Sequence, residues 1–297
     1  MLLRERQEIK TLALIISCYG IWGLVLFGPV SLPVWLMALL LIPTITFHSS
    51  LQHECIHGHP FIDRRLNDLI VSPPIGLFLP YPRFKELHLT HHLRARITNP
   101  TEDPESWYIT RREWANFSRF QKLMRNANNI LVGRMIIGPA LSIISLIYAD
   151  FQKIRKSNWQ LLGVWTMHLV LAFTLLVIIE NFSNISIVGY LIATYFSMSL
   201  LMIRTFLEHQ AHPDRRARSV LIDDKGLLRF LFLNNNLHAV HHAFPSVAWY
   251  RLPGLFRLHR DRLIEMNKGY FYKNYTEVFR AYGFVQKEPV VYPLDPV

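Results

Sequence analysis

Four long runs of apolar residues constrain this chain most, because each is long enough to cross a lipid bilayer. A helix needs about 20 mostly apolar residues to span the hydrocarbon core. The runs cover residues 11–28, 32–50, 159–179 and 185–207. Short segments separate the first run from the second and the third from the fourth, so each pair is predicted to form a helical hairpin. The hydrophobic content of 51% agrees with a membrane protein.

A further apolar stretch, residues 130–149, is long enough to cross but contains Arg134, glycines and a proline. Basic residues favour the cytoplasmic side of short loops. The loops 29–31 and 180–184 contain no Lys or Arg, whereas the segment 153–156 (KIRK) contains three. A fifth crossing would place KIRK on the side away from the other basic residues. We therefore predict that 130–149 forms a helix in the membrane interface.

The formal charge of +11 follows from this distribution of basic residues. Such residues are attracted to anionic lipid headgroups, and no nucleic-acid partner is expected. The two cysteines, Cys18 and Cys55, lie in an apolar run and among histidines, so no structural disulfide is predicted. The first span is expected to be retained, because no small-residue cleavage site follows it. The polar segments 51–129 and 208–297, with both termini, are predicted to be cytoplasmic.

The 14 histidines are clustered, and three groups have the spacing of metal ligands. The first is HxxxH and the other two are HxxHH. Residues three or four positions apart share one face of a helix, so each group can direct imidazoles to a common point. An adjacent pair is natural if each of its two histidines binds a different metal. Neutral imidazole suits Fe, Zn, Cu and Ni. The candidate ligands in these groups are His53, His57, His88, His91, His92, His238, His241 and His242.

Other histidines have separate expectations. His209 and His212 follow the fourth span, and one of them is expected to join the site, with the choice left open. His48, inside the second span, is a candidate for a hydrogen bond to a ligand. His59 is expected to cap the helix of the first group. His168 stands alone in a span and is expected to be buried and hydrogen-bonded.

Several polar residues close to these groups are candidates for orienting the imidazoles. Arg204 and Glu208, four residues apart, are expected to form a salt bridge. The segment 99–106 (NPTEDPES) is an acidic turn punctuated by prolines. It is expected to be a solvated loop, and the alternative is that it helps to orient the ligands. The acidic candidates are Glu54, Glu86, Asp103, Glu105 and Glu208.

The motifs HECIH, HLTHH and HAVHH, in this order, resemble the histidine boxes of the membrane fatty acid desaturase and hydroxylase superfamily. The resemblance runs from the second span to about Pro253. The phrases RTFLEH and NNNLHAVHH, with WYRLP following, are similar to bacterial members of the desaturase and carotenoid ketolase branch. The fold expected is an all-α integral membrane protein with a single domain over residues 1–297. It combines four transmembrane helices in two hairpins, an interfacial helix and a helical cytoplasmic cap that carries the metal site.

The resemblance also implies a chemistry. It implies two non-haem irons held by eight or nine histidines, with O₂ as co-substrate. Electrons would come from a separate ferredoxin-, rubredoxin- or cytochrome-type protein, since the chain lacks an HPGG-type cytochrome b5 motif. The implied reaction is desaturation of the acyl chain of a fatty acid or lipid in a bacterial plasma membrane. Hydroxylation or ketolation of a lipid or carotenoid is the alternative. In some members an asparagine lies at the site, for which the candidates here are Asn234, Asn235 and Asn236.

Three other classes fit the residues less well. HECIH is literally HExxH, in which His53 and His57 bind zinc and Glu54 is the base of a membrane hydrolase. Such a site needs about three protein ligands, which leaves both HxxHH groups unexplained. Bis-histidine haem needs paired histidines inside the spans, and only His48 and His168 lie there. Transporters place their ligands near the bilayer midplane, whereas these histidines follow the spans.

Overall fold

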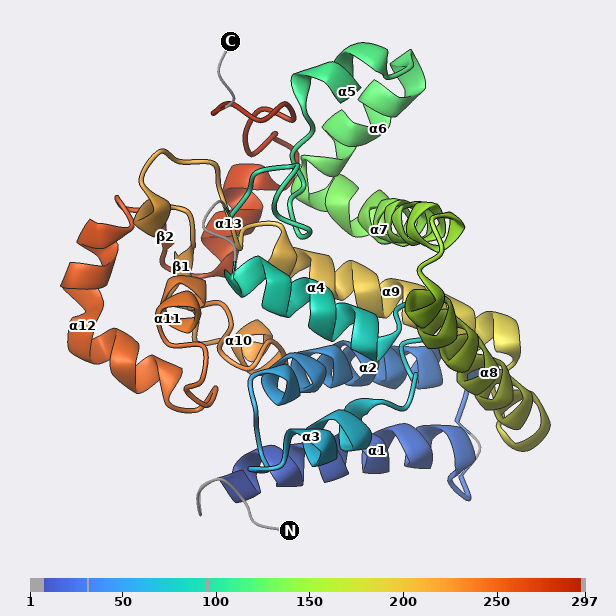
Figure 1. Cartoon of the computed structure of the whole chain (residues 1–297). Helices are drawn as coiled ribbons and strands as arrows, with labels where there is room; N and C mark the ends of the chain where they lie inside the picture. Colours follow the sequence, from blue (N-terminus) through green and yellow to red (C-terminus); the bar gives the residue numbers. More distant parts are fainter. Residues whose placement is uncertain (1–7, 31, 94–96, 295–297) are drawn as a thin grey trace. The chain divides into compact units, whose positions relative to one another are not determined.

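The computed structural model describes residues 8–30, 32–93 and 97–294, and helices dominate its secondary structure (Figure 1). The two ends of the predicted domain, residues 1–7 and 295–297, lie outside the described residues, as does Ser31 of the loop 29–31.

Five of the described helices are long and apolar enough to cross a membrane. Four of them overlap the predicted spans, with ends that agree within three residues, except that α2 continues six residues beyond the predicted end at residue 50 and so includes His53. The fifth, α7, contains the stretch that was predicted to lie in the interface. At most 44% of the residues in their most apolar windows are buried, so these helices present apolar side chains outward, as helices in lipid do. The chain is thus a mostly helical membrane protein. The five helices are α1 (Ile9–Phe27), α2 (Val34–Ile56), α7 (Leu131–Arg155), α8 (Trp159–Phe182) and α9 (Ile187–Thr205).

The chain divides into two compact units. The first comprises Met1–Lys85 and Pro139–Leu200, and the second comprises Glu86–Gly138 and Leu201–Val297. The divisions fall within three helices, namely α4 (Tyr81–Leu93), α7 and α9.

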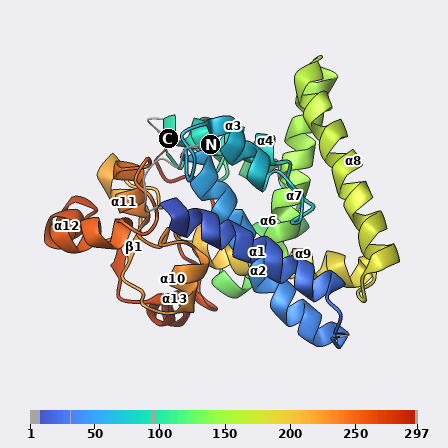
Figure 2. The same cartoon turned by 90° about the horizontal axis from the view of Figure 1, so that it is seen from below.

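In the first unit, α1 packs against α2, and α2 packs against α3 (Arg64–Val71) (Figures 1 and 2). Hydrogen bonds tie these helices to α9, which matters in lipid because no water is there to satisfy polar groups. Trp22 Nε1 donates to the Tyr190 hydroxyl over 2.9 Å, and Thr46 Oγ1 donates to the Ser197 carbonyl over 2.9 Å. The apolar core of this unit consists of Val25, Leu26, Met37, Leu41, Ile45, Leu77, Ala172, Ile179, Ile185, Tyr190 and Ala193.

The isolated histidines of the first unit have protein partners. His168 is buried in α8, and its Nε2 lies 2.6 Å from the Leu77 carbonyl oxygen, which confirms the expectation for this residue. His48 Nε2 lies 2.9 Å from the Tyr19 hydroxyl. The C-cap of α2 is His57, so His59 lies just beyond the helix. The Nδ1 atom of His59 is 2.8 Å from a carboxylate oxygen of Glu8.

The second unit consists mainly of short helices. The expected all-α fold is incomplete here, because β1 (Leu221–Ile222) and β2 (Phe271–Tyr272) form a small parallel pair. A buried apolar cluster packs α11 against α12 and β1, and its members are Leu221, Leu237, Val240, Leu252 and Phe256. Besides the ends of α4 and α9 and the start of α7, this unit contains α5 (Arg111–Asn116), α6 (Arg119–Asn128), η2 (Arg215–Ala217), α10 (Leu227–Leu231), α11 (His238–Ala243), α12 (Leu252–Met266) and α13 (Tyr275–Tyr282).

Candidate metal centre

Helices α4 and α11 carry the two HxxHH motifs. On each helix the i, i+3 and i+4 positions bring the three imidazoles to one side. The helix α11 starts at His238 itself. Leu233 and Asn234, with φ of 47° and 58°, turn the chain just before it. The first imidazole of the third box therefore follows directly after a tight turn.

The first set, called the His91 group, contains one histidine from α4, one that follows α9 and two from α11. Its Nε2 atoms approach one another closely within the second unit. His91 Nε2 lies 2.9 Å from His209 Nε2 and 3.3 Å from His242 Nε2. His238 Nε2 lies 3.0 Å from each of the same two atoms. The four ligand nitrogens all lie within 4.8 Å of one another, and the group consists of His91, His209, His238 and His242.

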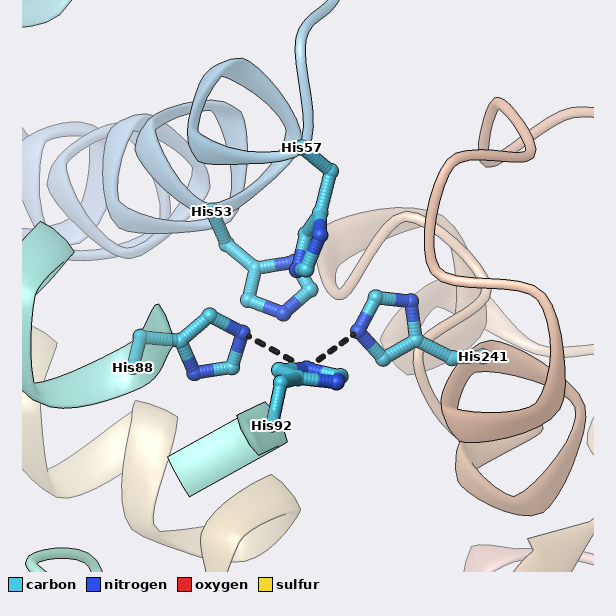
Figure 3. Close-up of side chains that lie close together, drawn as sticks. All are labelled: His53, His57, His88, His92 and His241. Atoms are coloured by element: carbon cyan, nitrogen blue, oxygen red, sulfur yellow. Dashed lines mark hydrogen bonds between the residues drawn. The ribbon is translucent and has the colours of Figure 1, made fainter. Parts of the chain in front are cut away.

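The second set, called the His92 group, consists of His88 and His92 from α4 and His241 from α11. His92 Nε2 lies 3.1 Å from His88 Nε2 and 3.2 Å from His241 Nε2, and the three rings turn toward one another (Figure 3). Each HxxHH motif is therefore divided between the two groups. This is the arrangement expected if adjacent histidines face different metals.

The remaining box belongs to the first unit. His53 lies in the last turn of α2 and His57 is its C-cap. Their ring centroids are 4.9 Å apart, so this pair also shares one side of its helix end. Figure 3 labels both residues.

The structure distinguishes between the two histidines that follow α9. His209 is part of the His91 group, and its backbone is held by an isolated antiparallel bridge to Ser219. His212 lies just before η2, and its Nδ1 accepts the backbone N–H of Asp214 over 3.0 Å. Among the described residues, His212 is in neither histidine group.

The acidic segment 99–106 holds the outer nitrogens of two imidazoles. His91 Nδ1 lies 2.8 Å from Asp103 Oδ1, and His88 Nδ1 lies 3.0 Å from Glu105 Oε1. Asp103 is only 4% exposed, and it also accepts the backbone N–H of Thr98 and of Glu105. The expectation of a solvated loop is therefore wrong and the alternative is confirmed, because Asp103 and Glu105 contact the imidazoles of α4.

A second chain of polar contacts reaches His238. Arg204 Nε lies 2.9 Å from Glu208 Oε1, which confirms the expected salt bridge. Asn235 Nδ2 donates to the same carboxylate oxygen over 3.1 Å, and Asn235 Oδ1 lies 3.0 Å from His238 Nδ1. Since the Asn235 oxygen can only accept, His238 Nδ1 is the donor.

Other candidates from the sequence lie elsewhere. The Asn234 and Asn236 side chains donate to the carbonyl oxygens of Trp249 and Ile222. A carboxylate oxygen of Glu54 lies 4.0 Å from His59 Nε2.

One contact was not expected from the sequence. Ser219 Oγ lies 3.3 Å from His209 Nδ1. No motif marks this serine, and the backbone bridge to His209 brings it into place.

A family model described as "Fatty acid desaturase" matches residues 29–274. The match covers most of the chain and includes all three histidine boxes together with His209. The chain belongs to the fatty acid desaturase family. Comparison with curated proteins finds no match. As a desaturase-family protein, it is a membrane oxidoreductase of the histidine-box type, and its histidine groups are consistent with a metal site.

The electrostatics of this desaturase-family site favour a bound cation. Burial lowers the pKa of His92 to about 3, and it holds the pKa values of His209, His238 and His242 well below the usual range. These imidazoles are therefore neutral at neutral pH and each offers a lone pair. For His91 burial also lowers the pKa, but the carboxylates of Glu105 and Asp103 outweigh it and raise the pKa to about 9.

The donor set fits a transition metal such as iron. His91 and His238 direct their Nδ1 atoms to side-chain oxygens, so their Nε2 atoms face the centre of the His91 group. Nitrogen lone pairs about 3 Å apart repel one another unless a positive charge lies among them. Imidazole nitrogens that share one metal ion each lie about 2.0–2.1 Å from it, so they lie within about 3–4 Å of one another. The distances of 2.9–3.3 Å between these nitrogens are compatible with a shared ion.

Proposed function

We propose that this desaturase-family protein is a di-iron, O₂-dependent oxidoreductase that introduces a double bond into the acyl chain of a fatty acid or lipid. The observation that supports this most is the division of both HxxHH motifs between two imidazole groups in the second unit. Two irons, when bound, would supply the oxidising power needed to remove hydrogen from an unactivated C–H bond with O₂.

The ligand assignment follows the two groups. The His91 group is proposed to hold one iron, and the His92 group is proposed to contribute to the other. His53 and His57 are proposed as further ligands because they form the first of the three boxes that resemble the family, and the family match includes them. Of the pair that follows α9, we propose His209 as the ligand and not His212. The full set is His53, His57, His88, His91, His92, His209, His238, His241 and His242.

The other residues of the site orient and protect these ligands. Asp103, Glu105 and Asn235 hold the Nδ1 atoms, which directs each Nε2 inward and makes it a better ligand. His91 and His238 are buried, so bulk water does not compete at their ring nitrogens. The protein thereby supplies a dry, preorganised set of donors.

The wider setting is part of the same proposal. The segments that carry the two groups are proposed to lie on the cytoplasmic side of a bacterial plasma membrane. There a separate ferredoxin-, rubredoxin- or cytochrome-type protein would deliver electrons. A hydroxylase or ketolase acting on a lipid or carotenoid is the alternative, since the same ligands serve both outcomes. A zinc hydrolase built on HECIH would use only three of the boxed residues, which disfavours it.

Metal and lipid analyses test this function together. Protein purified in detergent is expected to contain about two irons per chain, as an imidazole-rich donor set indicates. Its expression in a host is expected to add double bonds to membrane acyl chains. One zinc per chain without iron would contradict the proposal. New hydroxyl or keto groups, with iron present, would favour the alternative reaction.

Replacement of His92 tests the role of the second box. His92→Ala is expected to abolish product formation while the protein still accumulates in the membrane fraction, because the variant removes a ligand without changing the spans. His259→Ala is the matched control, since His259 lies exposed on α12 in the same unit. Wild-type activity in His92→Ala would refute the assigned role.

A further inference from the structure

The helices α5 and α6 form a small hairpin that the proposed function does not use. Both begin with a complete capping box, in which Thr110 pairs with Glu113 and Ser118 pairs with Gln121. Such caps satisfy the free N–H groups that make short helices unstable. The hairpin is closed by Lys122, whose Nζ lies 5.6 Å from the centre of the Trp114 ring. It is therefore a formed element rather than a loose connection.

Large apolar side chains of the hairpin and its neighbour face outward. Phe120 and Leu123, three residues apart on one side of α6, are 68% and 59% exposed. In the C-terminal segment Phe284 and Val285 are 84% and 59% exposed. Single exposed apolar residues are ordinary, but several close together mark a surface that contacts something apolar.

The chain between α6 and α7 joins these two segments. The Val132 N–H donates to the Gly283 carbonyl over 3.2 Å, and the Lys287 N–H donates to the Asn129 carbonyl over 3.0 Å. Between them, Ile130 pairs with Gln286 in an antiparallel bridge. Phe284 and Val285 therefore lie beside the junction of α6 and α7, and Figure 1 shows the C-terminal segment next to this green part of the chain.

The hairpin is also strongly basic. Between Thr110 and Asn128 the only acidic residue is Glu113. Basic side chains beside exposed aromatic and aliphatic ones are the signature of a helix that lies in a membrane interface, where cations meet lipid phosphates and apolar groups enter the acyl region. The five basic residues are Arg111, Arg112, Arg119, Lys122 and Arg125.

The position of α7 indicates that membrane lipid, rather than a protein, contacts the exposed side chains of the hairpin. The helix starts three residues after α6 ends, it is 25 residues long, and it is apolar enough to enter a bilayer. Ile136, near its start, is largely exposed. We therefore expect the start of α7 to lie at the boundary between headgroups and acyl chains. The helix α6 must lie near the same boundary, because it ends three residues before α7 begins. An acidic protein partner would match the charge but would leave these apolar side chains next to lipid without a role.

We propose that the α5–α6 hairpin and residues 283–285 form an interfacial anchor that binds anionic phospholipid headgroups and inserts Phe120, Leu123 and Phe284 below the phosphates. The anchor is independent of the proposed reaction. It fixes the entrance of α7 at the membrane surface.

Depth measurements test the insertion. The full chain with Phe120→Cys, labelled with an environment-sensitive fluorophore, is reconstituted in vesicles that contain acyl-brominated lipid as quencher. Asn126→Cys is the control, because it is partly exposed and lies about 120° away from Phe120 around the same helix. Wild-type protein controls for labelling of Cys18 and Cys55, which are both buried. Quenching at position 120 is expected to be at least twofold stronger than at 126, and equal quenching or none at 120 would overturn the insertion.

Lipid composition tests the headgroup contact. The same labelled protein is compared in phosphatidylcholine vesicles with and without phosphatidylglycerol. Quenching at position 120 is expected to increase with phosphatidylglycerol, to weaken as salt is added, and to lose this dependence in the triple variant R111Q/R112Q/R119Q. Iron content equal to that of wild type shows that the variant is folded. An unchanged signal with phosphatidylglycerol, or burial of position 120 only after an acidic protein is added, would overturn the proposal.

Discussion

At the scale of single residues, the carboxylates around the imidazoles matter as much as the imidazoles. Asp103 contacts His91 Nδ1 and also accepts two backbone N–H groups. It therefore orients the His91 ring and stabilises the turn in which Asp103 itself lies. Asp103→Asn preserves the shape but removes the negative charge. Loss of such an outer partner typically weakens metal binding by about 10–100-fold. We expect a decrease of this size in iron affinity, measured by competition with a chelator.

The control for this prediction is Asp261→Asn, since the Asp261 side chain is 98% exposed. Unchanged iron affinity in Asp103→Asn would show that His91 is oriented by its other contacts alone.

The histidines that form the two groups were largely predictable from the sequence, whereas the contacts of their outer nitrogens were less so. Periodic spacing marks His88, His91 and His92 because a helix makes i, i+3 and i+4 neighbours. Asp103 and Glu105 were among five acidic candidates because they lie near the second box, but the sequence did not show which imidazole each contacts, since only the folded turn brings them together. The choice of His209 over His212 also escaped prediction. The helix α9 ends at Thr205, so helical spacing no longer applies to the residues that follow it.

At the scale of elements, α11 depends on its neighbours. It has six residues and no side-chain cap, so it is too short to be stable alone. Val240 secures it by packing against Leu252 and Phe256 of α12. Phe256→Ala opens a cavity there, which typically costs about 3–5 kcal/mol. We expect a lower unfolding temperature in detergent and a clear loss of bound iron, because three histidines of the site lie on α11.

Leu258→Ala provides the matched control on the same helix, because Leu258 is 74% exposed. It is expected to change neither stability nor iron content. If Phe256→Ala also retained full iron content, the packing of α12 would not be what positions the third box.

Elements were predictable where hydropathy alone defines them. The apolar runs identified α1, α2, α8 and α9 because a helix in lipid must be apolar over its whole length. The short helices and the β1–β2 pair of the second unit carry too few apolar residues for a clear period. Their conformation depends on tertiary contacts, such as the Leu221 N–H bonded to the Tyr270 carbonyl.

At the scale of the whole molecule, the histidines restrict the membrane topology. His91 Nε2 and His209 Nε2 are 2.9 Å apart, so the chain between them crosses the bilayer an even number of times. Three helices of sufficient length, α7, α8 and α9, lie in that interval. The helices α8 and α9 are joined by only four residues, and the sequence predicts that each of them crosses once. We therefore expect that α7 does not complete a crossing.

Accessibility of single cysteines to a membrane-impermeant maleimide checks this topology. Lys156→Cys, just after α7, and Asp261→Cys, on α12, are both exposed and are expected to react from the same side of sealed vesicles. Asn184→Cys, in the turn between α8 and α9, is expected to react only from the other side. If position 156 reacted together with 184, α7 would cross the bilayer. One of α8 and α9 would then have to stay on one side, because the distance between His91 and His209 allows no odd number of crossings.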